Sequence, residues 1–379
     1  MTRTPRSIYV AFALMLCAAS ACARGADDIA RTTVYAIGEG NYHSYRIPAA
    51  IVTPAGILLA FCEGRQTPIG PGNDTGAINL IVKRSADNGK TFSDASLVWS
   101  DGENTCGNPC PVVDAETKTI FLLMTHNLGP DHERDIVRGT SKGKRTVHIT
   151  SSTDDGRTWT PPRDITADVA KENWTWYATG PGVGIQLKPG PHKGRLVIPC
   201  DHVVLGGGKD AGNAHIIFSD DHGKTWKLGG EPPEPGFNES QVVELSDGRV
   251  MLNMRNYTPN RRVGDVATRG IAISDDAGET FKEVRHDRTL VEPVCQASIL
   301  RVGKQILFSN PADAAKRINM TLRISDDDAQ TWSINKTIFP GPSAYSCLVA
   351  LPDGSVGLLY ECGEKKPYER IDFARFRLP

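Results

Sequence analysis

An eight-residue pattern, Ser-x-Asp-x-Gly-x-Thr followed by Trp or Phe, recurs five times along the chain. In each copy the Ser and Asp side chains can bond backbone N–H groups of a tight turn, and the Gly supplies a residue with positive φ. The aromatic ring is expected to pack beneath the turn. A β-branched run precedes the turns, so each copy predicts a β-hairpin. The fifth copy has Ala329 at the Gly position. The copies occupy residues 85–92, 152–159, 219–226, 274–281 and 325–332.

The spacing of these repeats predicts the architecture. Successive copies begin roughly 50–65 residues apart, a period that suits four short strands per unit, as in the blades of a β-propeller. No long stretch with a 3.6-residue hydrophobic period supports a helical alternative. We therefore expect an all-β, six-bladed β-propeller that occupies residues 30–379 as one domain. The segment 371–376 should pair with 33–37 and close the ring.

The N-terminus has the features of a secretory signal. Arg3 and Arg6 give a positively charged start, residues 8–19 form a short apolar run, and Ala-Cys22-Ala provides a cleavage site. We expect residues 1–23 to be a signal peptide and the mature protein to be secreted or periplasmic. An uncleaved anchor and a lipid on Cys22 are the alternatives. No later segment is long and apolar enough to form a transmembrane helix.

Charge and cysteine content narrow the possible partners. The formal net charge of −1 argues against nucleic-acid binding, although a small anionic ligand could still meet a local cluster of arginines. Cys106 and Cys110 are close enough in sequence to form a disulfide, whereas Cys62 and Cys200 lie in apolar runs typical of buried free thiols. No cysteine or histidine spacing indicates a metal site. We expect a monomer without metal or cofactor.

Further motifs point to a family. The repeats are similar to the Asp boxes of the sialidase superfamily, and Tyr-Arg46-Ile-Pro, followed by a strand, resembles the motif that opens sialidase propellers. The resemblance covers residues 34–376, nearly all of the mature chain. Asp boxes also occur in non-catalytic propellers, so they indicate the fold, and function has to be argued from the site.

The resemblance implies a clamp of three arginines that binds the carboxylate of the substrate. The matching residues are Arg46, Arg255 and Arg317, while Arg323 is a rival for the third position whose place just before the fifth repeat favours a structural role. Arginine suits this task because its planar guanidinium group binds a carboxylate through two hydrogen bonds and stays charged. Glu361 matches the glutamate that fixes the first arginine and thereby preorganises the clamp.

Tyr345 matches the family's nucleophile, and Glu239, in Asn-Glu-Ser-Gln, matches the glutamate that serves as its base. Sialidases use a tyrosine where most retaining glycosidases use a carboxylate. The anomeric carbon of sialic acid bears a carboxylate, which would repel an anionic nucleophile but not a neutral phenol. The phenol needs a base because its ordinary pKa is about 10.

Asp74 is the candidate general acid/base. In the family this aspartate follows a Glu-x-Arg stretch, here ending at Arg65, and Asp74 is the only carboxylate between Arg65 and the first repeat. An acid that is protonated at the working pH needs a raised pKa, from burial or from nearby negative charge. We expect Arg65 to contact the sugar or to orient Asp74. Asp201 and His202 follow an apolar run and are further candidates to line the pocket, although a strand-end role is the alternative for His202.

These residues predict an exo-α-sialidase that hydrolyses terminal, α-ketosidically linked sialic acids on glycoproteins, glycolipids and oligosaccharides. Two displacements through a covalent Tyr345 intermediate would retain the anomeric configuration. One alternative is a non-catalytic carbohydrate-binding propeller. The other is a trans-sialidase or a hydrolase of a related nonulosonic acid, which would differ in residues that these motifs do not identify.

Overall fold

The computed structural model describes residues 1–2, 29–67, 74–188, 190–207, 211–258, 262–263 and 266–378. A signal peptide is expected over residues 1–23. Its residues 3–23, including Cys22, lie outside the described residues. The described residues include two short helices, α1 (Glu133–Arg138) and α2 (Thr166–Val169), and otherwise strands, turns and loops. None of the described helices has the length and apolar character needed to cross a membrane. The expected all-β class is confirmed.

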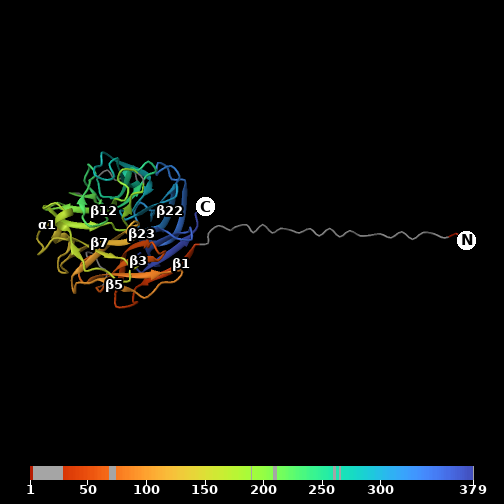
Figure 1. The fold of residues 1–379 in the computed structure, drawn as a ribbon, viewed down its shortest axis with the longest axis horizontal. Coiled ribbons are helices and arrows are strands. Elements are labelled where there is room, and N and C mark those ends of the chain that lie inside the picture. The colour runs from red at the N-terminus through yellow and green to blue at the C-terminus, as the bar shows by residue number, and fades with distance from the viewer. Residues whose placement is uncertain are drawn as a thin grey trace.

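Short, mainly antiparallel strands form sheets that curl around a common centre (Figure 1). The sheet that follows β1 along the chain has the order β2-β3-β4-β6-β7-β8-β9, with β5 beside β4. Its strands are β2 (Ser44–Val52), β3 (Leu58–Arg65), β4 (Ile78–Ser85), β5 (Ser96–Trp99), β6 (Thr105–Asp114), β7 (Thr119–Asn127), β8 (Thr146–Ser152) and β9 (Arg163–Asp164).

Two further sheets follow along the chain. The first has the order β10-β12-β13-β14 with β11 beside β12, and the second has the order β15-β16-β18-β17 with β19 beside β18. The strands of the first are β10 (Trp174–Thr179), β11 (Ile185–Gln186), β12 (Leu196–Val204), β13 (Gly212–Ser219) and β14 (Lys227–Leu228). Those of the second are β15 (Phe237–Glu244), β16 (Val250–Asn256), β17 (Arg262–Val263), β18 (Val266–Ser274) and β19 (Val284–Val291).

The last sheet joins the two ends of the fold in the order β1-β25-β24-β23-β22-β21-β20. β1 pairs antiparallel with β25, so that Thr33 lies opposite Asp372, which is the closure expected from the sequence. The Tyr35 hydroxyl donates a hydrogen bond to the Ala60 carbonyl at 2.8 Å and ties this sheet to β3. The strands are β1 (Ala30–Ala36), β20 (Ser298–Val302), β21 (Gln305–Pro311), β22 (Ile318–Ser325), β23 (Ile334–Ala350), β24 (Val356–Cys362) and β25 (Arg370–Phe376).

Two of the sheets contain narrow joints between groups of strands. β4 and β6 meet only through one parallel pair, Ile78 with Thr105. β23 is 17 residues long, and it pairs with β22 as far as Pro342 but with β24 from Ser343 onward. The strands on either side of each joint therefore form separate antiparallel groups.

The repeated octapeptides form the expected turns. In the first, the Asp87 carboxylate accepts hydrogen bonds from the Thr91 backbone N–H at 3.0 Å and from the Thr91 hydroxyl at 2.6 Å. The Ser85 hydroxyl accepts one from the Gly89 N–H at 2.9 Å. The fifth turn keeps this geometry, because Ala329 adopts a φ of 61° and its N–H bonds Ser325 in the same way.

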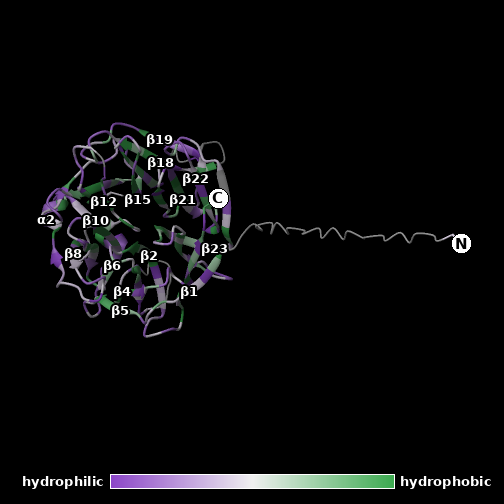
Figure 2. Ribbon diagram, turned by 45° about the vertical axis from the view of Figure 1, so that its right-hand side comes forward, coloured by the Kyte–Doolittle hydropathy of each residue, from purple (hydrophilic) through white to green (hydrophobic). Residues whose placement is uncertain are grey.

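In the first three turns the aromatic ring packs against a strand of a neighbouring group, whereas Trp332 of the fifth turn packs against Phe308 of β21, in its own group. Phe92 packs edge-on against Phe373 of β25, and Trp159 packs in the same manner against Phe61 of β3, with ring centroids 5.8 and 5.7 Å apart. The first three turns thus connect their own groups of strands to neighbouring groups. Hydrophobic residues fill the strands between these contacts, and hydrophilic residues concentrate in the outer loops (Figure 2).

The possible disulfide between Cys106 and Cys110 does not form. A register shift in β6 separates the two residues, and their side chains enter different hydrophobic clusters. All seven cysteines in the described part of the chain are buried free thiols, including Cys62 and Cys200 as expected.

Candidate active site

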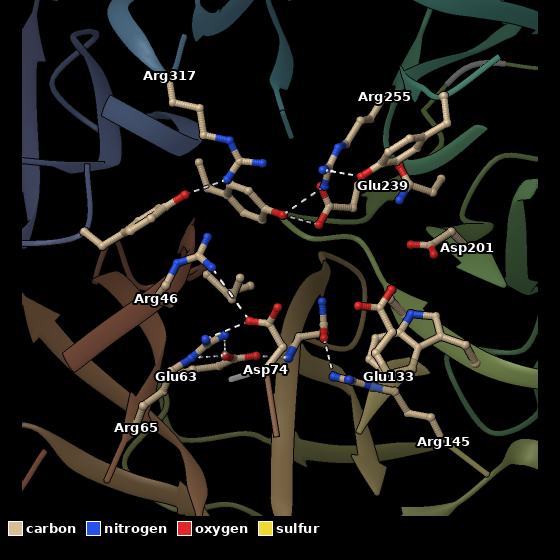
Figure 3. A pocket seen from close by; sticks show the side chains of 18 residues that line it. Arg46, Glu63, Arg65, Asp74, Glu133, Arg145, Asp201, Glu239, Arg255 and Arg317 are labelled. Atoms are coloured by element: carbon tan, nitrogen blue, oxygen red, sulfur yellow. Dashed lines mark hydrogen bonds and ion pairs between the residues drawn. The ribbon is translucent and has the colours of Figure 1, made fainter. Parts of the chain in front are cut away.

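A cavity of about 270 Å³ opens where the inner strands of the sheets approach one another (Figure 3). It gathers residues from β2, β3, β10, β12, β15, β16 and β23, which are far apart in sequence. Of the ten residues that the sequence indicated for the site, eight line this cavity, Glu361 lies directly beside it, and His202 does not line it. The eight are Arg46, Arg65, Asp74, Asp201, Glu239, Arg255, Arg317 and Tyr345.

Glu361 holds Arg46 in place. This fully buried carboxylate accepts hydrogen bonds from Arg46 Nε at 2.9 Å and Nη2 at 3.2 Å. It also accepts one from the Ile47 backbone N–H at 2.9 Å and one from the Tyr345 backbone N–H at 3.1 Å. Ile47 adopts a φ of 61°, a conformation that costs a β-branched residue energy and that the Glu361 contact supports. One carboxylate therefore fixes both the arginine and the strand that carries Tyr345.

The other two arginines face the same region from different strands. Arg255, on β16, donates from Nη1 to Glu239 at 2.6 Å and to the Tyr345 hydroxyl at 3.2 Å. Arg317, just before β22, donates to the Tyr368 hydroxyl at 2.8 Å and to the Val294 carbonyl at 3.1 Å. Arg323 does not line the cavity; it bonds Asn310 instead, which excludes it as the third arginine here.

The Tyr345 hydroxyl donates a short hydrogen bond to the Glu239 carboxylate. Burial and the charge of Glu239 raise the pKa of Tyr345 well above its usual value, against the opposing effect of Arg255, Arg317 and Arg46. The phenol therefore keeps its proton, which is already in contact with the Glu239 carboxyl group. This arrangement matches the pairing of these two residues that the sequence predicts.

Asp74 differs from the sequence-based expectation. Arg65 Nη1 donates to its carboxylate at 2.7 Å, and Arg46 Nη1 lies 3.8 Å away. Burial acts to raise the pKa of Asp74, but these two guanidinium groups outweigh it and hold the pKa below the usual value. The side chain is half exposed to the cavity. The pKa of Asp74 is therefore lowered, whereas a general acid needs a raised one.

Arg65 itself is held by a neighbouring carboxylate. The buried Glu63 accepts hydrogen bonds from Arg65 Nε at 3.0 Å and Nη2 at 2.5 Å. Its other oxygen accepts the Asn108 N–H at 2.9 Å. The expectation that Arg65 orients Asp74 is consistent with this arrangement.

The remaining wall contains residues that the sequence analysis did not identify. Arg145 donates to Asn108 at 2.5 Å and to the Thr125 hydroxyl at 3.0 Å, and its guanidinium carbon lies 4.2 Å from the centre of the Trp176 ring. Glu133, at the start of α1, lines the same wall. Arg145 stands in no recognisable local motif.

Asp201 and His202 alternate along β12 and point in opposite directions. Asp201 lines the cavity, whereas His202 is buried beneath it, stacked on Trp174 with ring centroids 3.5 Å apart. His202 is thus a core residue rather than a pocket residue. Among the described residues, no group of three or more His, Cys, Asp or Glu side chains is placed to hold a metal ion.

The family model described as "BNR repeat-like domain" matches residues 56–358. A sialidase of Micromonospora viridifaciens is 38% identical over 360 residues, which cover 89% of this chain and 53% of that protein. An exo-alpha-sialidase of Arthroderma benhamiae is 32% identical over 371 residues, which cover 89% of this chain and 84% of that protein. The chain therefore spans about half the length of the first relative and most of the second.

The structure resembles that of a Hadza microbial sialidase, Hz136, with a TM-score of 0.79 and 30% identity over 92% of this chain and 68% of that one. The fold is also shared with an intramolecular trans-sialidase of Ruminococcus gnavus, with a TM-score of 0.73 and 19% identity over 92% of this chain and 97% of that one.

Proposed function

The chain belongs to the sialidase family, and we propose that it is an exo-α-sialidase that removes terminal sialic acids from glycans with retention of configuration. The observation that carries this proposal is the group around Tyr345. A neutral phenol donates to Glu239 while Arg255 contacts both groups. The Arg46 and Arg317 guanidinium carbons lie 4.9 and 5.6 Å from the centre of the phenol ring. Three cations around an uncharged nucleophile suit a substrate whose reacting carbon bears a carboxylate.

We propose that the sheets form a six-bladed propeller. Dividing the first sheet at the single Ile78–Thr105 pair, and the last sheet within β23 after Pro342, gives four groups of antiparallel strands. With the two intervening sheets the total is six, in agreement with the period of the repeats. The cavity then lies at the centre of the ring, and the inner strands of different blades surround it.

In the first displacement, the Tyr345 oxygen attacks the anomeric carbon while its proton passes to Glu239. The bond between that carbon and the glycosidic oxygen breaks, and Asp74 protonates the departing oxygen. Because Tyr345 already donates to Glu239, this transfer requires little rearrangement. The product is a sialosyl–tyrosine bond and a free aglycone hydroxyl.

In the second displacement, the Asp74 carboxylate accepts a proton from water, and the resulting oxygen attacks the anomeric carbon. The tyrosine–carbon bond breaks, and the proton on Glu239 returns to the Tyr345 oxygen. Two inversions at one carbon give net retention.

The low pKa of Asp74 in the empty site follows from Arg65 and Arg46. When the substrate carboxylate binds Arg46, its negative charge offsets the positive charge of the guanidinium group. The same negative charge also disfavours the ionised form of Asp74. Both effects raise the pKa of Asp74. Substrate binding would therefore generate the protonated acid that the first displacement needs.

Replacing the nucleophile tests this function. Tyr345→Phe should lower kcat/KM on an aryl sialoside by about 10³-fold or more, because the variant lacks the attacking oxygen. In the wild type, mass spectrometry after treatment with a 2,3-difluorinated sialic acid should show an adduct on the peptide that contains Tyr345. Tyr360→Phe, which alters a buried tyrosine of the core away from the cavity, serves as the matched control and should remain active. Wild-type turnover by Tyr345→Phe would refute the mechanism, and sugar binding without cleavage by the wild type would support a binding propeller instead.

A further inference from the structure

Arg255 lies where the regular pairing of its strand breaks down. β16 pairs with β18 only as far as Met254, opposite Gly270. On the other edge of β16, the pairing with β15 shifts register between Phe237 and Ser240, and Arg255 falls within this shift. Regular strand pairing therefore does not fix the backbone at Arg255 on either side, and its position depends on other contacts.

A buried ion pair that does not line the cavity holds both sides of this position. Arg269, on β18, donates from Nη1 to Glu292 at 2.7 Å, and both side chains are buried. Arg269 also donates to Asn253, from Nε to the side-chain oxygen at 2.7 Å and from Nη2 to the backbone carbonyl at 3.3 Å. Glu292 accepts the Asn256 backbone N–H at 2.9 Å. The pair thus fixes β16 immediately before and after Arg255.

The same pair holds the segment that contacts Arg317. Arg269 Nη1 donates to the Cys295 carbonyl at 2.8 Å. The preceding carbonyl, that of Val294, accepts a hydrogen bond from Arg317 Nη2 at 3.1 Å. Val294 adopts a φ of 55°, a conformation that is unfavourable for a β-branched residue and needs support from its surroundings. Glu292 and Cys295, which flank it, both bond Arg269. One buried pair therefore supports two arginines of the clamp, which extend into the cavity from separate segments (Figure 3).

Stability alone gives little reason for this ion pair. The energetic cost of taking two charges out of water is comparable to their attraction, and apolar residues of similar volume often stabilise a core equally well. Apolar side chains, however, cannot donate to two backbone carbonyls and accept a backbone N–H. We propose that Arg269 and Glu292 are positioning residues, which place the guanidinium groups of the clamp so that they meet one carboxylate. This inference rests on the proposed function.

The test compares two inhibitors, a 2,3-didehydro sialic acid that carries the carboxylate and its analogue in which this carboxylate is reduced to a hydroxymethyl group. The double variant Arg269→Met with Glu292→Met removes both charges together, so that no unpaired charge remains buried. Its dissociation constant for the carboxylate inhibitor should rise about 10-fold or more, because a small displacement of an arginine weakens a contact made through two hydrogen bonds. The constant for the analogue should change by less than about 3-fold, since the analogue lacks the group that the clamp binds. NMR titration measures both constants.

Arg195→Met is the matched control. Arg195 is also buried, pairs with Asp220 at 2.7 Å and Glu279 at 2.9 Å, and does not line the cavity. It likewise donates to a backbone carbonyl, that of Ala277, at 3.2 Å. The variant should lower Tm but leave the ratio of the two dissociation constants unchanged, which separates loss of stability from loss of positioning.

Glu292→Gln provides a milder variant. It keeps the volume of the side chain and an acceptor for the Asn256 N–H, and it should shift the ratio in the same direction by a smaller factor, even if the double variant does not fold. Equal weakening of both inhibitors, or an unchanged ratio in the folded variants, would overturn the proposal. A wild type that binds the two inhibitors equally well would instead count against the arginine clamp of the proposed function.

Discussion

Glu361 illustrates how single residues organise this site. It accepts hydrogen bonds from the Arg46 side chain and from the backbone of Ile47 and Tyr345, so one carboxylate positions a cation and a nucleophile together. An arginine that is held in this way loses little conformational freedom when a carboxylate binds. Residues that only support the site can thus affect catalysis without contacting the substrate.

The role of Asp74 predicts a dependence on the leaving group. Asp74→Ala should lower kcat/KM about 10²-fold or more on a sialyl-oligosaccharide, whose departing alkoxide needs a proton. It should have a much smaller effect on an aryl sialoside with an acidic phenol, which departs without protonation. Parallel kinetic measurements on the two substrates check this, with Asp94→Ala, an exposed aspartate beside the first turn, as the control. Equal losses on both substrates would mean that Asp74 positions the sugar rather than protonating it.

Residues near recognisable motifs could be predicted from the sequence, and residues without them could not. Short motifs contain Arg46, Tyr345 and Glu239, and the residue types in these motifs indicate the chemical roles of the three side chains. Arg145, just before β8, contacts Asn108 and the Trp176 ring, which come from distant strands, so no local pattern reveals its place in the cavity. The low pKa of Asp74 could not be inferred from the sequence for the same reason, since it depends on how far two arginines lie from it in space.

At the scale of elements, the repeated turns act as contacts between groups of strands. The sequence predicted their internal hydrogen bonds, because these involve residues within one octapeptide. It did not predict that the rings of Phe92 and Trp159 pack against neighbouring groups, because Phe373 and Phe61 come from distant strands. The bulge that separates Cys106 from Cys110 could likewise not be inferred from the short distance between the two cysteines in the sequence.

The third turn allows this role to be tested. Gly223 has a φ of 77°, and a Cβ atom there would lie 2.4 Å from the Phe121 ring of β7. Gly223→Ala should therefore lower the free energy of unfolding by about 3 kcal/mol, through backbone strain and the clash together. Gly248 has a φ of 86° with nothing within 4 Å of the added Cβ, so Gly248→Ala should cost only about 1 kcal/mol. Urea unfolding measures both, and equal effects would show that the contact between the groups adds nothing.

At the scale of the whole molecule, a buried histidine pair links stability to pH. His202 and His215 approach through their Nδ1 atoms at 3.1 Å, and His215 Nε2 lies 2.8 Å from the Tyr177 hydroxyl. One Nδ1 must donate and the other accept, so a second proton on the acceptor breaks the contact. Burial, together with Lys171, lowers the pKa of His202 to about 3, and burial lowers that of His215 well below its usual value.

The sign of the effect follows from linkage. Below a pH of about 6.5 the unfolded chain takes up protons on these histidines while the folded chain does not, so stability falls as the pH falls toward 3. Glu231, 3.6 Å from His202 Nε2, is the nearest carboxylate and also pairs with Lys171. His202→Gln should make the decline in unfolding free energy between pH 6.5 and 4 shallower, by up to about 1.4 kcal/mol per pH unit. His192→Gln, on the loop between β11 and β12, should leave the slope unchanged, and identical slopes in all three proteins would contradict the assignment.

The pairing of β1 with β25 has a consequence for how this architecture can be encoded. Since Ala30 lies opposite Arg375 and Ala36 opposite Arg370, the first and last strands of the fold are adjacent partners in one sheet. The other strand pairings among the described residues do not require the polypeptide to start at β1. A chain rearranged to begin at a different turn, with residues 378 and 29 joined by a linker, would contain the same strand neighbours and the same cavity. The order of the motifs along the sequence thus depends on where the polypeptide starts. The chemistry of the site depends only on which strands are neighbours in space.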